Sequence, residues 1–174
     1  MEITYFGSSS FRIKGKSAIL VTDPATVKLP KHTIADIVTG SAGEVEGPPY
    51  IVHGPGEYEI KGVGIIGHKS EKNIMYRIEI DGISIVHLGA TSHPLSAAEV
   101  DSLDGVDILL IPIGESAVSV INEIEPSVVI PLCYTKEQLT AFLKEIGKED
   151  VAPQPKLSIT KDKLPEQMQV VILE

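Results

Sequence analysis

The sequence predicts a mixed α/β fold in which helices lie outside two packed sheets. In its first half, short strand-like runs are separated by glycine, proline and serine, a pattern typical of antiparallel hairpins. In its second half, apolar runs alternate with segments of helical periodicity, which indicates β-α-β units. With 174 residues, no internal repeat and no linker, the chain is expected to form a single domain over residues 1–174.

Strands of the first half are expected at residues 2–6, 10–14, 18–22, 37–39, 50–53, 63–67 and 73–80. Gly15 lies between the second and third of these runs, and Asp81-Gly82 follows the last. A hairpin turn is expected at each of these two positions, because such turns prefer glycine and Asp-Gly pairs. Asp23 ends the third run, because a residue that precedes proline is restricted to extended or turn geometry. Residues 24–36 show no clear period and are expected to form a loop or a short helix.

Three largely apolar runs in the second half indicate strands that are buried on both faces; they lie at 83–87, 108–111 and 128–130. Ser96 and Thr135 each precede Glu or Gln by three residues, which is the spacing of a helix capping box. A further helix is expected at 116–124 from its apolar stripe. Two late runs, 156–160 and 169–173, are expected to return to sheet edges.

Composition excludes several classes of function. Fifteen basic against 24 acidic residues give a net charge of −9, which argues against non-specific nucleic-acid binding. Cys133 is the one cysteine, so no intrachain disulfide can form, as suits a reducing cytoplasm. The start of the chain lacks the pattern of a signal peptide, and no apolar run approaches the roughly 18 residues of a membrane span. We therefore expect a cytoplasmic protein with no nucleic-acid or membrane partner. Its partners are not identified by the sequence, and a homo-oligomer is compatible with it.

Polar or turn residues follow three of the predicted strands in the second half, at 87–93, 113–115 and 131–134. In open α/β sheets, ligands bind beyond the carboxyl ends of the strands. Together with Asp23 and the stretch 40–47, these loops are the expected location of a functional site.

Seven sequence blocks resemble, in order, those of the metallo-β-lactamase superfamily. They read MEITYFGSSSFRIKG, ILVTDP, ADIVTG, HGPGEYEIKGVGI, IVHLGATSHPLS, VDILLIPIG and IEPSVVIPLCY. The resemblance covers nearly the whole chain and is to the small branch of ascorbate-6-phosphate lactonase-like and Zn-dependent hydrolase-like proteins. It implies a four-layer αββα sandwich. Active members of the family bind one or two metal ions, usually zinc, and hydrolyse lactones, amides, thioesters or phosphoesters.

The motif that carries this chemistry in the family is missing here. The family places H-x-H-x-D-H after the strand that matches 37–39, whereas residues 40–47 contain no histidine. The family's metal-bridging aspartate corresponds to Ala90 and its late histidine to Cys133; a further family histidine matches His68 loosely. A catalytic zinc site needs about three protein ligands and an open position for water. Since the remnants His68 and Cys133 number only two, we expect no cofactor and a non-catalytic protein that acts by binding or self-association.

Two alternatives remain open at this stage. One is a residual hydrolase of lactone, ester or phosphoester substrates. It would use an atypical zinc site built from His68, His87, His93 or Cys133, or a Cys133 nucleophile with a histidine base such as His93. The other is a ligand-binding domain that retains the emptied pocket. The residues expected to line that pocket are Asp23, His87, Ala90, His93 and Cys133.

Each of these residues also has a purely structural interpretation. Cys133 ends an apolar strand and is expected to be a buried, unreactive thiol unless a neighbouring cation lowers its pKa. His87 is expected to be a hydrogen-bonded core histidine. Asp23 either orients the loop that once held metal or simply forms a turn.

Overall fold

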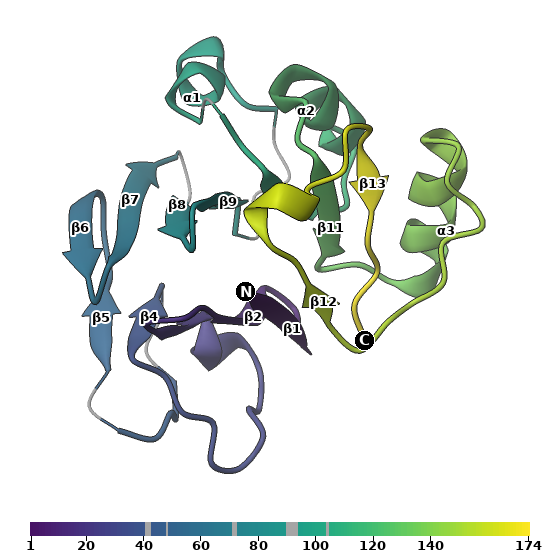
Figure 1. The fold of residues 1–174 in the computed structure, drawn as a ribbon. Coiled ribbons are helices and arrows are strands. Elements are labelled where there is room, and N and C mark those ends of the chain that lie inside the picture. Colours follow the sequence, from purple (N-terminus) through teal and green to yellow (C-terminus); the bar gives the residue numbers. More distant parts are fainter. Residues whose placement is uncertain (41–42, 48, 71–72, 90–93, 104) are drawn as a thin grey trace.

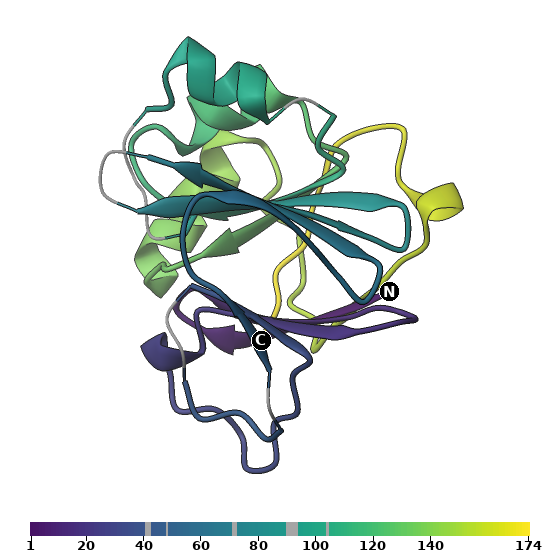
Figure 2. The same cartoon turned by 90° about the vertical axis from the view of Figure 1, so that its left-hand side faces the viewer.

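Two β-sheets face each other, and α-helices cover the outer face of one of them (Figures 1 and 2). The computed structural model describes residues 1–40, 43–47, 49–70, 73–89, 94–103 and 105–174. Within these residues, the prediction of a mixed α/β fold with two packed sheets is confirmed.

The first sheet has six strands in the order β12-β1-β2-β3-β4-β5. The strands are β1 (Glu2–Gly7), β2 (Ser10–Lys14), β3 (Ile19–Thr22), β4 (Ile37–Thr39), β5 (Tyr50–Val52) and β12 (Leu157–Ser158). β12, β1, β2 and β3 pair antiparallel, whereas β3, β4 and β5 pair parallel. β5 therefore forms one edge of this sheet, and the short strand from the C-terminal region forms the other.

The second sheet has seven strands in the order β13-β11-β10-β9-β8-β7-β6. They are β6 (Gly56–Ile60), β7 (Val63–Lys69), β8 (Ile74–Ile80), β9 (Ile83–His87), β10 (Ile108–Pro112), β11 (Val128–Leu132) and β13 (Gln169–Val170). β9, β10, β11 and β13 are parallel, and β6 to β9 form an antiparallel meander. The expected turn at Asp81-Gly82 joins β8 to β9, with both residues at positive φ. The two late runs do return to sheet edges.

Helices α1 (Ala97–Ser102), α2 (Ala117–Ile124) and α3 (Lys136–Glu145) follow the strands of the second sheet. Ser96 with Glu99, and Thr135 with Gln138, form the two predicted capping boxes. Apolar residues of these helices and of the outer face of β9–β11 make one core. None of the helices in the described ranges is long and apolar enough to cross a membrane.

A loop covers the outer face of the six-stranded sheet. It contains a short 3-10 helix, η1 (Pro24–Thr26), and packs Val45 against a small apolar cluster around Val21 and Val38. A four-layer sandwich has helices on the outer face of both sheets. On the outer face of the six-stranded sheet, the described residues between β3 and β4 form only the short helix η1. Pro24 lies at the start of η1, where proline is tolerated, whereas a helix continued from η1 would be interrupted at Pro30. A second 3-10 helix, η2 (Lys161–Lys163), precedes β13.

The largest core lies between the two sheets and includes the fully buried Ile3, Phe11, Ile37, Ile65 and Ile85. Because side chains of a strand alternate between its faces, these residues identify the face of each strand that points inward. This alternation decides which of the candidate site residues can meet.

Candidate functional site

Four strand ends and one turn meet at one edge of the sandwich. We call this region the carboxyl-end site and define it by Ser8, Asp23, Gly40, His87 and Cys133. Asp23 follows β3, Gly40 follows β4, His87 ends β9, and Cys133 follows β11; Ser8 lies in the β1–β2 turn. The two turn residues Ser8 and Ser9 were not anticipated as part of a site, although the run Gly7 to Ser10 marks a turn in the sequence.

His87 is held by the chain through both of its ring nitrogens. The side chain is only 1% exposed, on the inward face of β9 with Ile85. Its Nε2 lies 2.8 Å from the carbonyl oxygen of Ser9 and must donate, since a carbonyl oxygen only accepts. Its Nδ1 then accepts from the N–H of Gly89 at 3.3 Å. Burial lowers the pKa of His87, and the negative charge of Asp23 opposes this shift. These contacts are those of a neutral core histidine.

Cys133 is half-buried and is connected to the β1–β2 turn. Its N–H donates to the carbonyl oxygen of Ser8 at 3.2 Å, and its Sγ lies 3.8 Å from Ser8 Oγ. Burial raises the pKa of the Cys133 thiol; the Ser8 hydroxyl lowers it and the charge of Asp23 raises it further. Tyr5 donates its hydroxyl to the same Ser8 carbonyl at 2.9 Å, and burial raises the pKa of Tyr5 to about 12. The site therefore favours a protonated thiol.

Asp23 is in the left-handed region, with φ 41°, and its side chain packs directly against Gly40. A Cβ on Gly40 would lie 1.9 Å from Asp23 Oδ1, and Gly40 itself has φ +80°. Only glycine fits both constraints at this position. The negative charge of Asp23 acts to raise the pKa values of Tyr76, His87 and Cys133. Asp23 therefore lies close to the other two predicted residues, His87 and Cys133.

His68 is not part of this group. On β7 it lies opposite Met75 of β8, and Met75 packs into the helix-side core, whereas Ile65 points inward. His68 and His87 thus point to opposite faces of the same sheet. β7 and β11 are four strand positions apart, about 19 Å at a spacing of ~4.8 Å, so the structure does not bring His68 and Cys133 together. The pKa of His68 is lowered by burial and by the charge of Arg77.

Two predicted site residues, Ala90 and His93, lie outside the described residues. The structure therefore places neither of them.

A layer of polar side chains underlies the carboxyl-end site between the two sheets. Thr22 Oγ1 donates to Ser9 O and accepts from Phe11 N–H, both at 2.9 Å, and Tyr76 donates to Val52 O at 3.3 Å. Thr39 Oγ1 is buried and has no hydrogen-bond partner among the described residues. No sequence pattern predicted this layer, because threonine is common in strands whatever its hydrogen bonding.

The donors of the carboxyl-end site do not fit a family-type zinc centre. Of the five residues that define the site, His87 offers no free nitrogen, which leaves the Asp23 carboxylate and the Cys133 sulfur. His53, which follows β5, lies beside them with its Nδ1 3.1 Å from Gly40 O. Across the described ranges, no three His, Cys, Asp or Glu side chains are grouped so that they could hold a metal ion. A catalytic zinc requires about three protein ligands.

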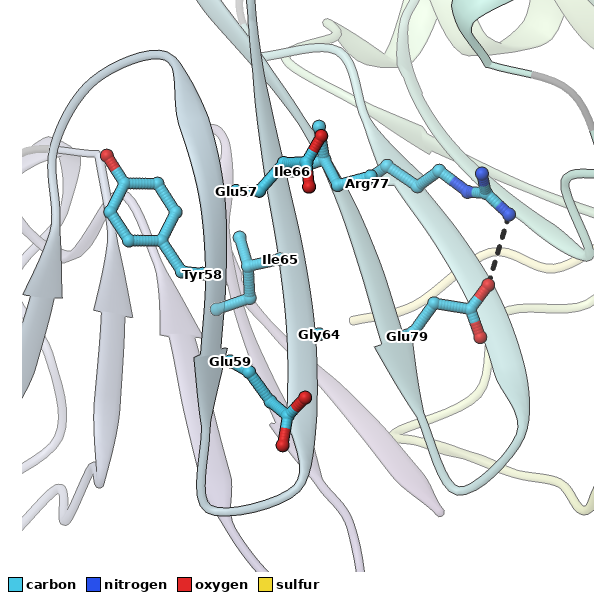
Figure 3. Close-up of a pocket in the computed structure, with 8 residues that line it drawn as sticks. All are labelled: Glu57, Tyr58, Glu59, Gly64, Ile65, Ile66, Arg77 and Glu79. Carbon is cyan, nitrogen blue, oxygen red and sulfur yellow. Dashed lines mark hydrogen bonds and ion pairs between the residues drawn. The ribbon is translucent and has the colours of Figure 1, made fainter.

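The cavity shown in Figure 3 lies elsewhere, on the outer face of β6, β7 and β8. Its volume is about 370 Å³, and Glu57, Glu59, Ile66, Arg77 and Glu79 contribute to its lining. Arg77 is bound within the sheet, to Glu79 at 3.1 Å and to Ser84 Oγ at 3.2 Å. None of the predicted site residues lines this cavity.

A second cavity, of about 580 Å³, lies between residues 24–33 and 43–46. It begins at Pro24, next to the carboxyl-end site, but none of the residues that define the site lines it.

Comparison with known proteins identifies the family. The model of the beta-lactamase superfamily domain matches residues 2–133. A comparison with curated protein sequences gives no significant match. Among solved structures, a proposed Zn-dependent hydrolase of the metallo-beta-lactamase superfamily from Thermotoga maritima is 30% identical, with a TM-score of 0.86. The alignment covers 100% of this chain and 99% of that one.

More distant structures share the fold. Igni18, a metallo hydrolase from Ignicoccus hospitalis, is 18% identical with a TM-score of 0.63; the alignment covers 91% of this chain and 99% of that one. An isothiocyanate hydrolase from Delia radicum gut bacteria is 13% identical with a TM-score of 0.69, over 92% and 99% of the two chains. The family model and the Thermotoga structure together show that this chain belongs to the metallo-beta-lactamase superfamily.

Proposed function

We propose that this protein is a non-catalytic member of the superfamily that acts by binding or self-association. The observation that carries the proposal is that both ring nitrogens of His87 are hydrogen-bonded to the backbone. His87 is the one described histidine on the inward face at the carboxyl-end site, and the chain itself occupies both of its nitrogens. The absence of histidine from residues 40–47 supports the same conclusion.

The consequence for catalysis follows from the role of zinc in the family. Zinc lowers the pKa of its bound water to about 7 and so supplies hydroxide at neutral pH. Without the ion, the pKa of water stays near ~15.7, and the family's nucleophile is not formed. Asp23 and Cys133 alone do not complete a ligand set.

Metal content tests this proposal. The protein is purified without chelators from cells grown with added zinc, iron and manganese, and the metals are measured by elemental analysis. We expect well under one equivalent of each metal, before and after dialysis against Zn²⁺. One tightly held equivalent that is lost in a Cys133→Ala or Asp23→Asn variant would overturn the proposal.

The alternative is a residual hydrolase, with zinc as cofactor or with Cys133 as nucleophile and His93 as base. It is supported by the half-buried position of Cys133 beside the Ser8 hydroxyl. Against it, burial raises the pKa of the thiol, so the reactive thiolate is scarce at neutral pH. A screen of aryl esters, lactones and phosphodiesters, with and without Zn²⁺ and Mn²⁺, tests it. Activity that disappears in Cys133→Ala and His93→Ala would establish the alternative.

Three narrower proposals rest on the sequence. The seven blocks support placement in the small lactonase-like branch of the family, the lack of a linker supports one domain over 1–174, and the single cysteine supports a cytoplasmic location. Fractionation of cells that express a tagged chain tests the location.

A further inference from the structure

Two polar side chains at the carboxyl-end site have no partner within the part of the chain that the structure describes. Asp23 forms hydrogen bonds there only through its backbone, with Thr39 O and with the N–H and hydroxyl of Thr26. Its partly buried carboxylate takes part in none of the ion pairs between described residues. The hydroxyl of Thr39 is buried, at 0% exposure of the residue, and has no hydrogen-bond partner. Because buried polar groups are normally satisfied, two such groups at one place indicate a polar ligand.

The two groups lie next to each other. Thr39 pairs with Thr22, which directly precedes Asp23, and Asp23 N–H donates to Thr39 O at 2.9 Å. Thr39 is on the inward face of β4, since Ile37, two residues earlier, packs between the two sheets. Asp23 Oδ1 lies against Gly40, where a Cβ would be only 1.9 Å away. The carboxylate therefore lies at the outer end of the buried polar layer, nearer to solvent than the Thr39 hydroxyl.

The groups around Asp23 favour a cation. The charge of Asp23 acts to raise the pKa values of His87 and Cys133, and no described lysine or arginine acts on either of them. The nearby histidine adds an acceptor. His53 Nδ1 lies 3.1 Å from Gly40 O and must donate to it, so Nε2 of the neutral ring accepts. A ligand that fits these groups carries a positive charge and N–H donors.

We infer that the carboxyl-end site binds the ammonium group of a small molecule, with the Asp23 carboxylate as its counterion. One carboxylate is enough for an ammonium group, which brings three N–H donors of its own, whereas a catalytic zinc needs about three protein ligands. A hydrogen bond between charged groups is about twice as strong as one between neutral groups. This inference rests on the proposed function, because a bound metal would take the same carboxylate, and it names the class of ligand for that site.

The backbone holds the carboxylate in position before any ligand binds. Asp23 has φ 41° and Gly40 has φ +80°, and this pair of left-handed residues sets the side chain of Asp23 directly against the glycine. A group that is already ordered loses less entropy on binding. The contact is small, so an ammonium group without further substituents is expected to bind with a dissociation constant no lower than roughly 1 mM.

An NMR titration of the chelator-treated protein with ethylammonium chloride, at constant ionic strength, tests the inference. Tetramethylammonium chloride is the matched probe, because it has the same charge and no N–H donor. We expect the backbone amide signals of Asp23 and Gly40 to shift in a saturable manner with ethylammonium. Tetramethylammonium should bind at least about tenfold more weakly, since it forms no charge-assisted hydrogen bond. This comparison uses the wild-type protein alone.

Asp23→Asn is the main variant, because asparagine has the same shape without the charge and tolerates the left-handed conformation. Asp101→Asn, at an exposed position of α1, removes the same charge elsewhere and is the matched control. The dissociation constant for ethylammonium should rise at least about tenfold in Asp23→Asn and stay unchanged in Asp101→Asn.

Three results would overturn the inference. One is a set of ethylammonium shifts that rise without saturation, and another is saturable shifts that remain in Asp23→Asn. The third is saturable binding of Nα-acetyl-lysinamide but not of ethylammonium, which would indicate a lysine side chain of a partner protein. The proposed function fails on stoichiometric metal, which elemental analysis detects, whereas this inference fails on amine binding by metal-free protein. The two failures are therefore distinguishable.

Discussion

Thr22 and Thr39 lie opposite each other on β3 and β4, but their hydroxyl groups differ in hydrogen bonding. Both residues are 0% exposed. Thr22 Oγ1 makes two hydrogen bonds at 2.9 Å, whereas Thr39 Oγ1 has no partner in the part of the chain that the structure describes. Valine has nearly the shape of threonine, so substitution to valine isolates the effect of the hydroxyl. We expect the two substitutions to differ in the sign or size of their effect on the free energy of unfolding.

The magnitudes follow from these contacts. Thr22→Val leaves the buried N–H of Phe11 without an acceptor, and such a loss costs about 1–3 kcal/mol. Thr39→Val removes a buried hydroxyl that gains no protein hydrogen bond, so the variant should be as stable as the wild type or up to ~2 kcal/mol more stable. The free energies of unfolding of the two variants should therefore differ by roughly 1–5 kcal/mol.

Urea unfolding followed by circular dichroism measures both values on the same protein background. The slope of the free energy of unfolding against urea concentration should be the same in the wild type and both variants, since the surface exposed on unfolding does not change. A Thr39→Val variant that loses as much stability as Thr22→Val would refute the reasoning. It would mean that the Thr39 hydroxyl is satisfied after all.

The remaining predictions concern the carboxyl-end site. Burial lowers the folded-state pKa of His87 below its ordinary value of about 6.5, so the unfolded chain binds more protons below that pH. The free energy of unfolding is therefore expected to fall as the pH falls below about 6.5. The decline is at most about 1.4 kcal/mol per pH unit. His87→Gln should flatten this dependence in urea titrations, and an unchanged slope would contradict the assignment. Gly40→Ala should destabilise by more than about 1 kcal/mol beyond Gly147→Ala, because a Cβ at Gly147 meets no atom within 4 Å; both are measured by urea unfolding. Iodoacetamide should alkylate Cys133 more slowly than a free-cysteine peptide at neutral pH, and Asp23→Asn should accelerate the reaction; equal rates would refute the role of the carboxylate. A chelator should leave the thermal unfolding midpoint unchanged, and a fall in the midpoint would indicate a stabilising metal.

Local sequence signals predicted most of the fold. Capping boxes located α1 and α3, and the Asp81-Gly82 turn fixed the register of β8 and β9. β6 (Gly56–Ile60) was missed, because its glycine-rich start indicated only a tight turn. As an edge strand it buries little, so it lacks the apolar pattern by which strands are recognised. Tertiary pairing with β7, rather than local propensity, makes it a strand.

The candidate site was predictable only in part. The strand ends identified Asp23, His87 and Cys133, and period-two alternation along β7 would have placed His68 on the opposite face from Ile65. The carbonyl of Ser9 that binds His87 is 78 residues away in sequence, so no local pattern could reveal it. Hydrogen bonds of this kind decide whether a histidine is free to bind metal.

Backbone strain links these contacts to the organisation of the site. Ser8, Asp23 and Cys133 have φ values of 51°, 41° and 52°, in the left-handed region that costs a non-glycine residue about 1–2 kcal/mol. Strain of this kind persists only where the surroundings hold it. The bonds that hold it are made by the chain itself. Cys133 N–H binds Ser8 O at 3.2 Å, and Asp23 N–H binds Thr39 O at 2.9 Å. The β1–β2 turn thus binds both residues: Ser9 O accepts from His87 Nε2, and Ser8 O accepts from Cys133 N–H. Because these bonds join two strand ends to one turn, they hold the strained residues in place.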